Sequence, residues 1–203
     1  MIRRFIYSIL EIPFVYNLSQ VILAPGAYKQ LKKHFGVIFK DSRGKILDVG
    51  CGPKLTTPKP LNAKITGLDI NSAYIKQFKA QEGCGGVVGS SEMAPFKTNA
   101  FDEARCFAVL HHLPSELALN TIKEMIRCTR VGGKVIVIDG VWPINPWLLP
   151  LAWLNRKLDR GQWMRHENEL KEMVAKASSK EWQTKRFSYT YIGHEAVVLT
   201  LQK

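Results

Sequence analysis

The chain has 203 residues, of which 46% are apolar and 23% charged, and it carries a net charge of +12 at pH 7. This length suits one well-buried domain and excludes two domains of ordinary size, while the composition excludes a disordered chain. The four cysteines form no C-x-x-C pair and no cluster with histidine at zinc spacing, which predicts a reducing, cytoplasmic compartment and no metal site.

The first 25 residues contain two apolar patterns of helical spacing, separated by Pro13. The apolar positions are Ile2, Phe5, Ile6 and Ile9, followed by Phe14, Leu18, Val21 and Ile22. Polar residues interrupt this stretch too often for a signal peptide or a membrane span. Two short amphipathic helices are therefore predicted, whose apolar faces either cover the domain's own core or serve a membrane contact or a substrate gate.

Strand and helix patterns alternate through the middle of the chain. Helices are predicted at 28–39, 72–81 and 115–129, and strands at 45–49, 65–69, 86–89, 103–108 and 134–139. The glycine pair in "RVGGKVIVID" is expected to stop the helix before the fifth strand. Such an alternation predicts an α/β fold with a Rossmann-like, doubly wound and mostly parallel sheet.

The end of the chain departs from this alternation. The stretch "VWPINPWLLPLAWLNRKLDRG" holds three tryptophans and three prolines, too many prolines at its start for a core helix. A helix at 167–177 and two antiparallel strands at 182–187 and 196–201 are predicted after it. No repeat or linker divides the chain, so 1–203 is predicted to be one domain. Its parts are a helical cover (1–40), a core (41–141), a lid segment (142–166) and a terminal helix with two strands (167–203).

The stretch "KILDVGCGPK" predicts a strand that ends in a loop containing Gly50 and Gly52. Such a loop presents backbone N–H groups to a ligand, but Lys54 replaces the third glycine of the dinucleotide fingerprint, and prolines weaken the helix that should follow. Asp69 ends the next strand, 21 residues after Asp48 (69 − 48), where an acidic side chain binds a ribose. The loop therefore suits a nucleoside with a ribose diol and no diphosphate.

Five motifs follow one another at regular spacing. They are "ILDVGCGP", "ITGLDIN", "VVGSSEMAPF", "FDEARCFAVLHHLP" and "RVGGKVIVID". Over residues 45–139 they resemble the class I S-adenosylmethionine-dependent methyltransferases of the small-molecule type, similar to the ubiquinone and menaquinone methyltransferases. "LDRGQWMRHENEL" is similar to a stretch beyond the core of some of these enzymes. The resemblance implies a seven-stranded sheet, S-adenosylmethionine as cofactor and methyl transfer to a small molecule.

The resemblance also implies a cofactor-binding set. It consists of Asp48, Gly50, Cys51, Gly52, Asp69, Ile70, Ser91, Glu92, Met93 and Phe107. Asp48 would face the ammonium group of the cofactor, and Asp69 would accept both ribose hydroxyls. Ile70 and Met93 would enclose the adenine. Ser90 stands where the family usually has an aspartate for the adenine amino group, so its hydroxyl or one of its two neighbours would have to substitute.

The catalytic candidates are His111 and His112, just beyond the end of the fourth strand. A general base is needed only if the acceptor must lose a proton, and an imidazole can take it near neutral pH. The alternative is that one histidine caps the following turn and the other is packed. Cys51 is interpreted as a packed thiol rather than a nucleophile, because no base lies near it in the sequence.

Three functions remain open. The favoured one is methyl transfer to a small, apolar or lipid-like acceptor. The substitutions Lys54 and Ser90 suggest a non-catalytic scaffold with the same fold. The net charge suggests a nucleic-acid methyltransferase, but the basic residues are dispersed and no [Asn/Asp/Ser]-Pro-Pro-[Tyr/Phe] motif is present, so a nucleic-acid partner is not expected.

The tryptophan-rich segment after the fifth strand is predicted to form a lid over the acceptor site. Trp142, Trp147 and Trp153 offer more apolar surface than a connection needs. They either select an apolar acceptor or pack on the N-terminal helices, and both could form walls of one pocket. Arg156, Lys157 and Arg160 follow and would suit a membrane headgroup or an anionic substrate, which adds peripheral membrane contact to the expected cytoplasmic location.

Overall fold

The computed structural model describes residues 26–159 and 161–203. The two amphipathic helices predicted within the first 25 residues therefore lie outside the described residues, as does Arg160. Among the helices of the described part, none is both long enough and apolar enough to cross a membrane.

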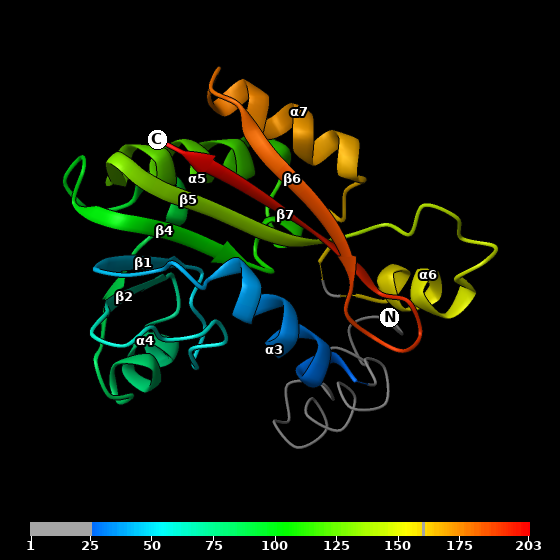
Figure 1. The fold of residues 1–203 in the computed structure, drawn as a ribbon, viewed down its shortest axis with the longest axis horizontal. Coiled ribbons are helices and arrows are strands. Elements are labelled where there is room, and N and C mark those ends of the chain that lie inside the picture. Colours follow the sequence, from blue (N-terminus) through cyan, green and yellow to red (C-terminus); the bar gives the residue numbers. More distant parts are fainter. Residues whose placement is uncertain (1–25, 160) are drawn as a thin grey trace.

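The strands of the described residues form one sheet in the order β3-β2-β1-β4-β5-β7-β6 (Figure 1). Their bounds are β1 Lys45–Val49, β2 Lys64–Asp69, β3 Cys84–Val88, β4 Phe101–Phe107, β5 Thr129–Val141, β6 Trp182–Ser188 and β7 Glu195–Gln202. The first five pair in parallel, whereas β7 is antiparallel to β5 and to β6. The predicted Rossmann-like sheet is confirmed. Its winding reverses between β1 and β4, and ligands of such sheets bind beyond the carboxyl ends of the strands at this point.

Helices cover both faces of the sheet (Figure 1). On one face lie α3 (Ala27–Ile38) and α4 (Ser72–Lys79), and on the other α5 (Ser115–Cys128) and α7 (Glu167–Ala177). The short helix α6 (Pro150–Lys157) lies beyond the end of the sheet, and two single 3-10 turns, η1 (Ser91–Met93) and η2 (Leu110–His112), follow β3 and β4. The largest apolar core fills the space between the sheet and the α5–α7 layer.

β5 begins earlier than the sequence predicted. It pairs with β4 from Thr129, opposite Phe101, and the pairing then shifts register before it resumes at Lys134, opposite Glu103. The glycines expected to stop a helix lie in this irregular part of the strand instead, and Gly132 has a φ of +73°, which glycine adopts readily. The prediction of a helix stop at these glycines was therefore wrong, because α5 already ends at Cys128.

No helix follows β1 in the described chain, as the prolines predicted, and residues 50–63 run irregularly to β2. The third glycine of a dinucleotide loop permits close packing of a helix on its strand, so without that helix an exposed Lys54 is tolerated. The side chain of Gln81 supports the loop. It accepts the N–H of Leu55 at 3.0 Å and donates to the carbonyl of Pro53 at 3.4 Å.

Arg105 of β4 also supports this loop, from the sheet. Its side chain is fully buried, donates to the carbonyl of Pro58 at 2.9 Å and lies over the ring of Phe39, 5.2 Å from its centroid. Burial raises the pKa of Asp48, its register partner on β1, to about 6; the charge of Arg105 opposes this shift and that of Glu103 adds to it. The guanidinium therefore ties the loop to the sheet and offsets two buried acids.

Replacing Arg105 by methionine keeps most of the volume and removes the charge. The carbonyl of Pro58 then loses its donor, and the pKa values of Asp48 and Glu103, both already raised by burial, rise further. An acid with a raised folded pKa loses stabilising free energy as the pH increases through that pKa. Arg105→Met should therefore lower the unfolding free energy by about 2–4 kcal/mol at about pH 8 and by less at about pH 5.

Urea denaturation at the two pH values measures this difference. Arg130→Met is the matched control, because Arg130 makes an ion pair with Asp102 at 2.6 Å but is half exposed, so its loss should change stability little at either pH. An equal loss at both pH values for Arg105→Met would mean that Arg105 acts only through the carbonyl of Pro58.

Candidate functional site

The candidate residues follow the carboxyl ends of four parallel strands. Asp48 and the glycine loop come from β1, Asp69 and Ile70 from β2, Ser91–Met93 from η1 after β3, and Phe107 and the two histidines from β4. Because β3, β2, β1 and β4 are neighbours in this order, all four groups reach the same edge of the sheet. The topology therefore brings the whole set together.

The β1 loop turns sharply at its two glycines. Gly50 has a φ of +66° and Gly52 one of +62°, a region that favours glycine. The N–H groups of Gly50 and Cys51 both donate to the carbonyl of Leu68, at 2.7 and 3.2 Å, which holds the loop on β2. A side chain at Gly50 would overlap Val109, whereas one at Gly52 would meet no atom within 4 Å. Gly50 thus permits close packing of the loop after β4, and Gly52 faces open space.

Asp69 closes the same loop from the neighbouring strand. Its carboxylate accepts the N–H of Gly52 at 3.0 Å and the N–H of Asn71 at 2.9 Å. Asn71 in turn caps α4, with its side-chain oxygen accepting the N–H groups of Ala73 and Tyr74. The carboxylate is half-buried and has more acceptor positions than these two bonds use, so it can also accept ligand hydroxyls.

Asp48 and Cys51 lie deeper in the site. Asp48 is buried, and a ligand cation placed beside it would lower its raised pKa and be held by the resulting charge. Burial raises the pKa of the Cys51 thiol to about 12, with the carboxylates of Asp48 and Asp69 adding to the shift. The thiol therefore stays protonated at neutral pH, which agrees with a packed cysteine and not with a nucleophile.

The apolar residues predicted around the adenine differ in exposure. Ile70 is 75% exposed and Met93 is 78% exposed, so both are available to contact a flat ring. Phe107 is half-buried and packs edge-to-face against Phe35 of α3, with 5.1 Å between ring centroids. Ala108, directly after β4, has a φ of +56°, a strained conformation of the kind that clusters at functional sites.

The three polar residues after β3 are already engaged with protein groups. The Ser90 hydroxyl donates to the Glu92 carboxylate, and the Ser91 hydroxyl lies 2.8 Å from the hydroxyl of Thr121 on α5. Ser90 therefore positions Glu92, and Glu92 is the acid nearest to the position where the family usually has an aspartate. Ser91 instead links η1 to α5.

His111 forms a buried pair with Asp139 of β5. Nδ1 lies 2.5 Å from Oδ1, Oδ2 accepts the backbone N–H of His111 at 2.9 Å, and Gly140 donates its N–H to Oδ1 at 2.7 Å. Burial alone lowers the pKa of His111, but the charge of Asp139 and its hydrogen bond outweigh burial and raise it. Burial would raise the pKa of Asp139, but the charge of His111 and the hydrogen bonds from His111 and Gly140 lower it instead. Asp139 is thus a carboxylate that holds the proton on Nδ1 and leaves Nε2 as the basic nitrogen.

The second ring nitrogen of His111 faces Asp159, just beyond α6. Nε2 lies 4.0 Å from Oδ1, and the Asp159 side chain is 29% exposed. The other oxygen of Asp159 lies 3.8 Å from Nη1 of Arg156. His112 is exposed, with its ring centroid 4.1 Å from that of His111. The two candidate histidines therefore differ: His111 belongs to a buried polar cluster, and His112 lies at the surface.

Arg156 connects α6 to the sheet. It is buried, and its Nη2 donates to the Tyr189 hydroxyl at 2.7 Å and to the carbonyl of Glu195 at 2.9 Å. Gly140 makes room for it, because a Cβ at that position would overlap the guanidinium. The expectation that Arg156 faces a headgroup or a substrate at the surface was wrong, since the fold uses its charge to anchor α6. Burial also lowers the pKa of the adjoining His194 to about 4, so this histidine is neutral.

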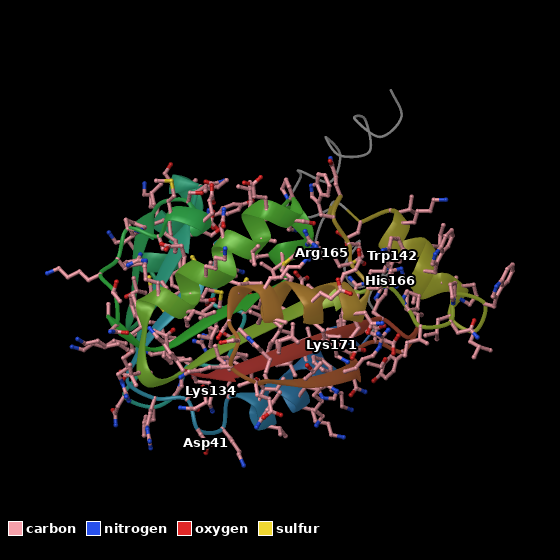
Figure 2. All side chains as sticks on the ribbon, turned by 90° about the horizontal axis from the view of Figure 1, so that it is seen from above. Asp41, Lys134, Trp142, Arg165, His166 and Lys171 are labelled. Atoms are coloured by element: carbon pink, nitrogen blue, oxygen red, sulfur yellow. The ribbon has the colours of Figure 1, made fainter. Side chains whose placement is uncertain are left out.

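Arg165 fixes the loop that carries His111. Its guanidinium donates to the carbonyls of Leu110 and Leu113, each at 2.7 Å. Figure 2 shows Arg165 beside Trp142, and the backbone N–H of Trp142 donates to the carbonyl of Arg165 at 3.1 Å. The segment after α6 therefore holds both the end of β5 and the loop after β4.

Three members of this cluster were not predicted from the sequence. Asp139 carried a usable signal, because it is an acid at the carboxyl end of a buried strand, where the ligand crevice lies. Arg156 and Asp159 carried no local signal for this role, since only the fold brings them to His111 and β5.

Comparisons with known proteins agree with this architecture. Residues 47–137 match a family described as a methyltransferase domain. The demethylmenaquinone methyltransferase of Desulfitobacterium hafniense is 27% identical over 172 residues, which are 78% of this chain and 60% of the relative. The chain spans about 60% of the length of the curated relatives it matches.

Solved structures share the fold. An S-adenosylmethionine-dependent methyltransferase from Methanosarcina mazei has a TM-score of 0.61 and 20% identity, over 82% of this chain and 96% of that one. Geranyl diphosphate C-methyltransferase from Streptomyces coelicolor, solved with S-adenosyl-L-homocysteine, has a TM-score of 0.59 and 12% identity, over 85% of this chain and 79% of that one. At such identities the likeness shows the fold alone, while the family match covers the motifs of the candidate site.

Asp69→Ala should weaken S-adenosylmethionine binding by about 1–3 kcal/mol in calorimetry, the usual cost of losing hydrogen bonds to a charged partner. Asp69→Asn should cost less, because the amide oxygen still accepts one bond. Asp41→Ala removes an exposed carboxylate at a remote edge of the molecule (Figure 2) and should leave affinity unchanged. If both Asp69 variants bind S-adenosylmethionine as tightly as the parent does, Asp69 does not contact the cofactor.

The two loop glycines should separate folding from binding. Gly52→Ala adds a methyl group in open space and costs about 1–2 kcal/mol of backbone strain, so S-adenosylmethionine affinity should fall more than stability. Gly50→Ala adds the overlap with Val109 and should give the lower melting temperature. Thermal unfolding and calorimetry on both variants measure the two effects. If Gly50→Ala proved more stable than Gly52→Ala, the assignment of Gly50 to packing and of Gly52 to binding would be contradicted.

Proposed function

We propose that this chain is a class I S-adenosylmethionine-dependent methyltransferase and that it methylates a small apolar acceptor, which gives up a proton to His111. The observation that carries the proposal is the buried His111–Asp139 pair. His111 lies two residues after Val109, which packs against the glycine loop. The family match over the core favours an enzyme over a non-catalytic scaffold.

The cofactor, when bound, supplies an electrophilic methyl group. Asp48 would hold its ammonium, which suits a buried carboxyl whose raised pKa a neighbouring cation would lower. Asp69 would accept the ribose hydroxyls while it keeps the loop closed through Gly52. The adenine would lie against Ile70 and Met93, two large apolar side chains that are otherwise exposed. The residues present therefore fit the cofactor.

His111 would act as the general base. A hydroxyl, phenol or activated carbon becomes a stronger nucleophile when it loses its proton, and methyl transfer then depends on in-line geometry. The Nε2 lone pair would accept this proton while the Nδ1 proton stays on the hydrogen bond to Asp139, whose charge stabilises the imidazolium. Asp159, 4.0 Å from Nε2 and partly exposed, would pass the proton to solvent. The acceptor would gain the methyl group that the bound cofactor supplies and lose its proton to His111, and the cofactor would leave as a neutral thioether.

An apolar acceptor is supported by the segment that follows β5. The rings of Trp142 and Trp153 lie 6.5 Å apart, half-buried, beyond the carboxyl end of this strand, where the acceptor would enter. The two relatives named for their acceptors are named for a demethylmenaquinone and for geranyl diphosphate. We infer an acceptor of this kind, with residues 142–166 as its lid.

His111→Ala should lower turnover by about 10²–10⁴-fold and leave S-adenosylmethionine affinity nearly intact. Turnover is measured as S-adenosylhomocysteine release with reduced demethylmenaquinone and with geranyl diphosphate. The rate should rise with pH through the raised pKa of His111, because the base must be unprotonated. His112→Ala is the matched control and should retain most of the activity.

Asp139→Asn tests the charge of the pair. The amide can still accept a hydrogen bond but carries no charge, so the pKa of His111 should fall, and the rise of rate with pH should move to lower pH. NMR titration of the imidazole measures this pKa directly. If His111→Ala lowers only the melting temperature and activity persists, His111 is a packing residue.

A further inference from the structure

The segment around α6 presents large apolar side chains to solvent. Trp147 is 91% exposed, and five further apolar side chains of this segment are each at least 48% exposed. Together they form what we call the α6 surface: Ile144, Trp147, Leu148, Leu151, Leu154 and Leu158. α6 lies at one end of the molecule (Figures 1 and 2), beyond the carboxyl end of β5. An apolar surface of this size, carried by one continuous segment, indicates a binding partner.

The polarity of α6 is inverted relative to an ordinary surface helix. Leu151, Leu154 and Leu158 recur at helical spacing on the exposed side, whereas the buried side carries Ala152 and Arg156. Arg156 is fixed by its bonds to the Tyr189 hydroxyl and to the carbonyl of Glu195. If the helix turned its leucines inward, Arg156 would lose both of these hydrogen bonds. The outward orientation of the leucines is therefore built into the fold.

The turn before α6 is also ordered. The side-chain oxygen of Asn145 accepts the N–H of Trp147 at 3.0 Å, and its backbone carbonyl accepts the N–H of Leu149 at 3.2 Å. Leu149 packs toward Gly193 of the β6–β7 turn, where an added Cβ would overlap its side chain. Trp147 and Leu148 are therefore held outward by a structured turn.

The segment that carries the α6 surface has basic and no acidic side chains up to Leu158, and the acid that follows, Asp159, faces Arg156 and His111. Residues 140–158 contain no aspartate or glutamate, and Lys157 is exposed with its ammonium 4.9 Å from the centroid of the Trp153 ring. Apolar side chains with an indole and an adjacent exposed lysine match the interface of an anionic bilayer.

We propose that the α6 surface docks this protein peripherally on an anionic lipid bilayer. Trp147 and the leucines enter the interfacial region, and Lys157 contacts the headgroups. A symmetric contact between two copies would place like charges against each other. The proposal goes beyond the methyl-transfer proposal and does not depend on it, because lipid binding requires neither cofactor nor acceptor.

Co-sedimentation of the full chain tests this docking with two vesicle compositions. One is pure phosphatidylcholine, and the other contains two parts phosphatidylcholine and one part phosphatidylglycerol. We expect binding to the anionic vesicles, weakened by salt, and weaker binding to the neutral ones. Trp147→Glu and Lys157→Glu should each reduce the apparent affinity by about tenfold or more. Leu61→Glu is the matched control, because Leu61 is equally exposed but precedes β2 at the opposite end of the sheet.

Each outcome decides the proposal. Retained binding in Leu61→Glu with loss in Trp147→Glu, at unchanged melting temperature, supports it. Equal binding by the parent and all three variants assigns any lipid affinity to the general net charge and overturns it. A large drop in the melting temperature of Trp147→Glu means that the chain itself covers this surface. A change in oligomeric state of Trp147→Glu, measured by sedimentation velocity, means that a second copy does, and either result overturns membrane docking.

Discussion

The position of Asp139 is the constraint on which the site depends. One buried carboxylate accepts the backbone N–H and the ring N–H of His111 and the N–H of Gly140. A buried charge is costly unless it is paired and fully hydrogen-bonded, so these bonds hold only in one arrangement of β5 and the loop after β4. That loop also carries Val109, which packs against Gly50. The catalytic candidate and the glycine loop are therefore positioned through the same contact.

Two buried arginines serve parallel purposes on the sheet. Arg105 supports the loop after β1 through the carbonyl of Pro58, where this chain has an irregular segment in place of a helix. Arg156 anchors α6 through Tyr189 and the carbonyl of Glu195, which leaves the leucines of that helix exposed. In both cases a cation occupies a position where an apolar side chain would ordinarily pack, and a hydrogen bond to one carbonyl offsets part of its desolvation. Much of the chain's basic character is thus at the surface, but these two charges are structural.

Most of the architecture could be predicted from local patterns. The bounds of β1 and α7 agree with the predicted ranges, because each is a short apolar pattern closed by clear turn or capping residues. β5 was predicted too short, since a strand that continues through an irregular pairing looks in sequence like a glycine turn. Of the partners of His111, Asp139 could be suspected from its place at the end of a buried strand, whereas Asp159 could not, because only the fold brings the segment after α6 to His111. Contacts between residues distant in sequence follow from strand order and register, which one sequence does not specify.

The proposed site and the α6 surface lie at the same end of the molecule. The cofactor residues and His111 follow the carboxyl ends of parallel strands, and α6 leaves the carboxyl end of β5, so both belong to one edge of the sheet. Asp159 joins them directly, since one of its oxygens faces His111 and the other faces Arg156 on α6. A lipid-like acceptor leaving a bilayer at α6 would meet Trp153 and Trp142 before it reached His111. It would therefore pass from one apolar environment to another without exposing its apolar surface to water, which removes the largest free-energy cost of extracting such a molecule.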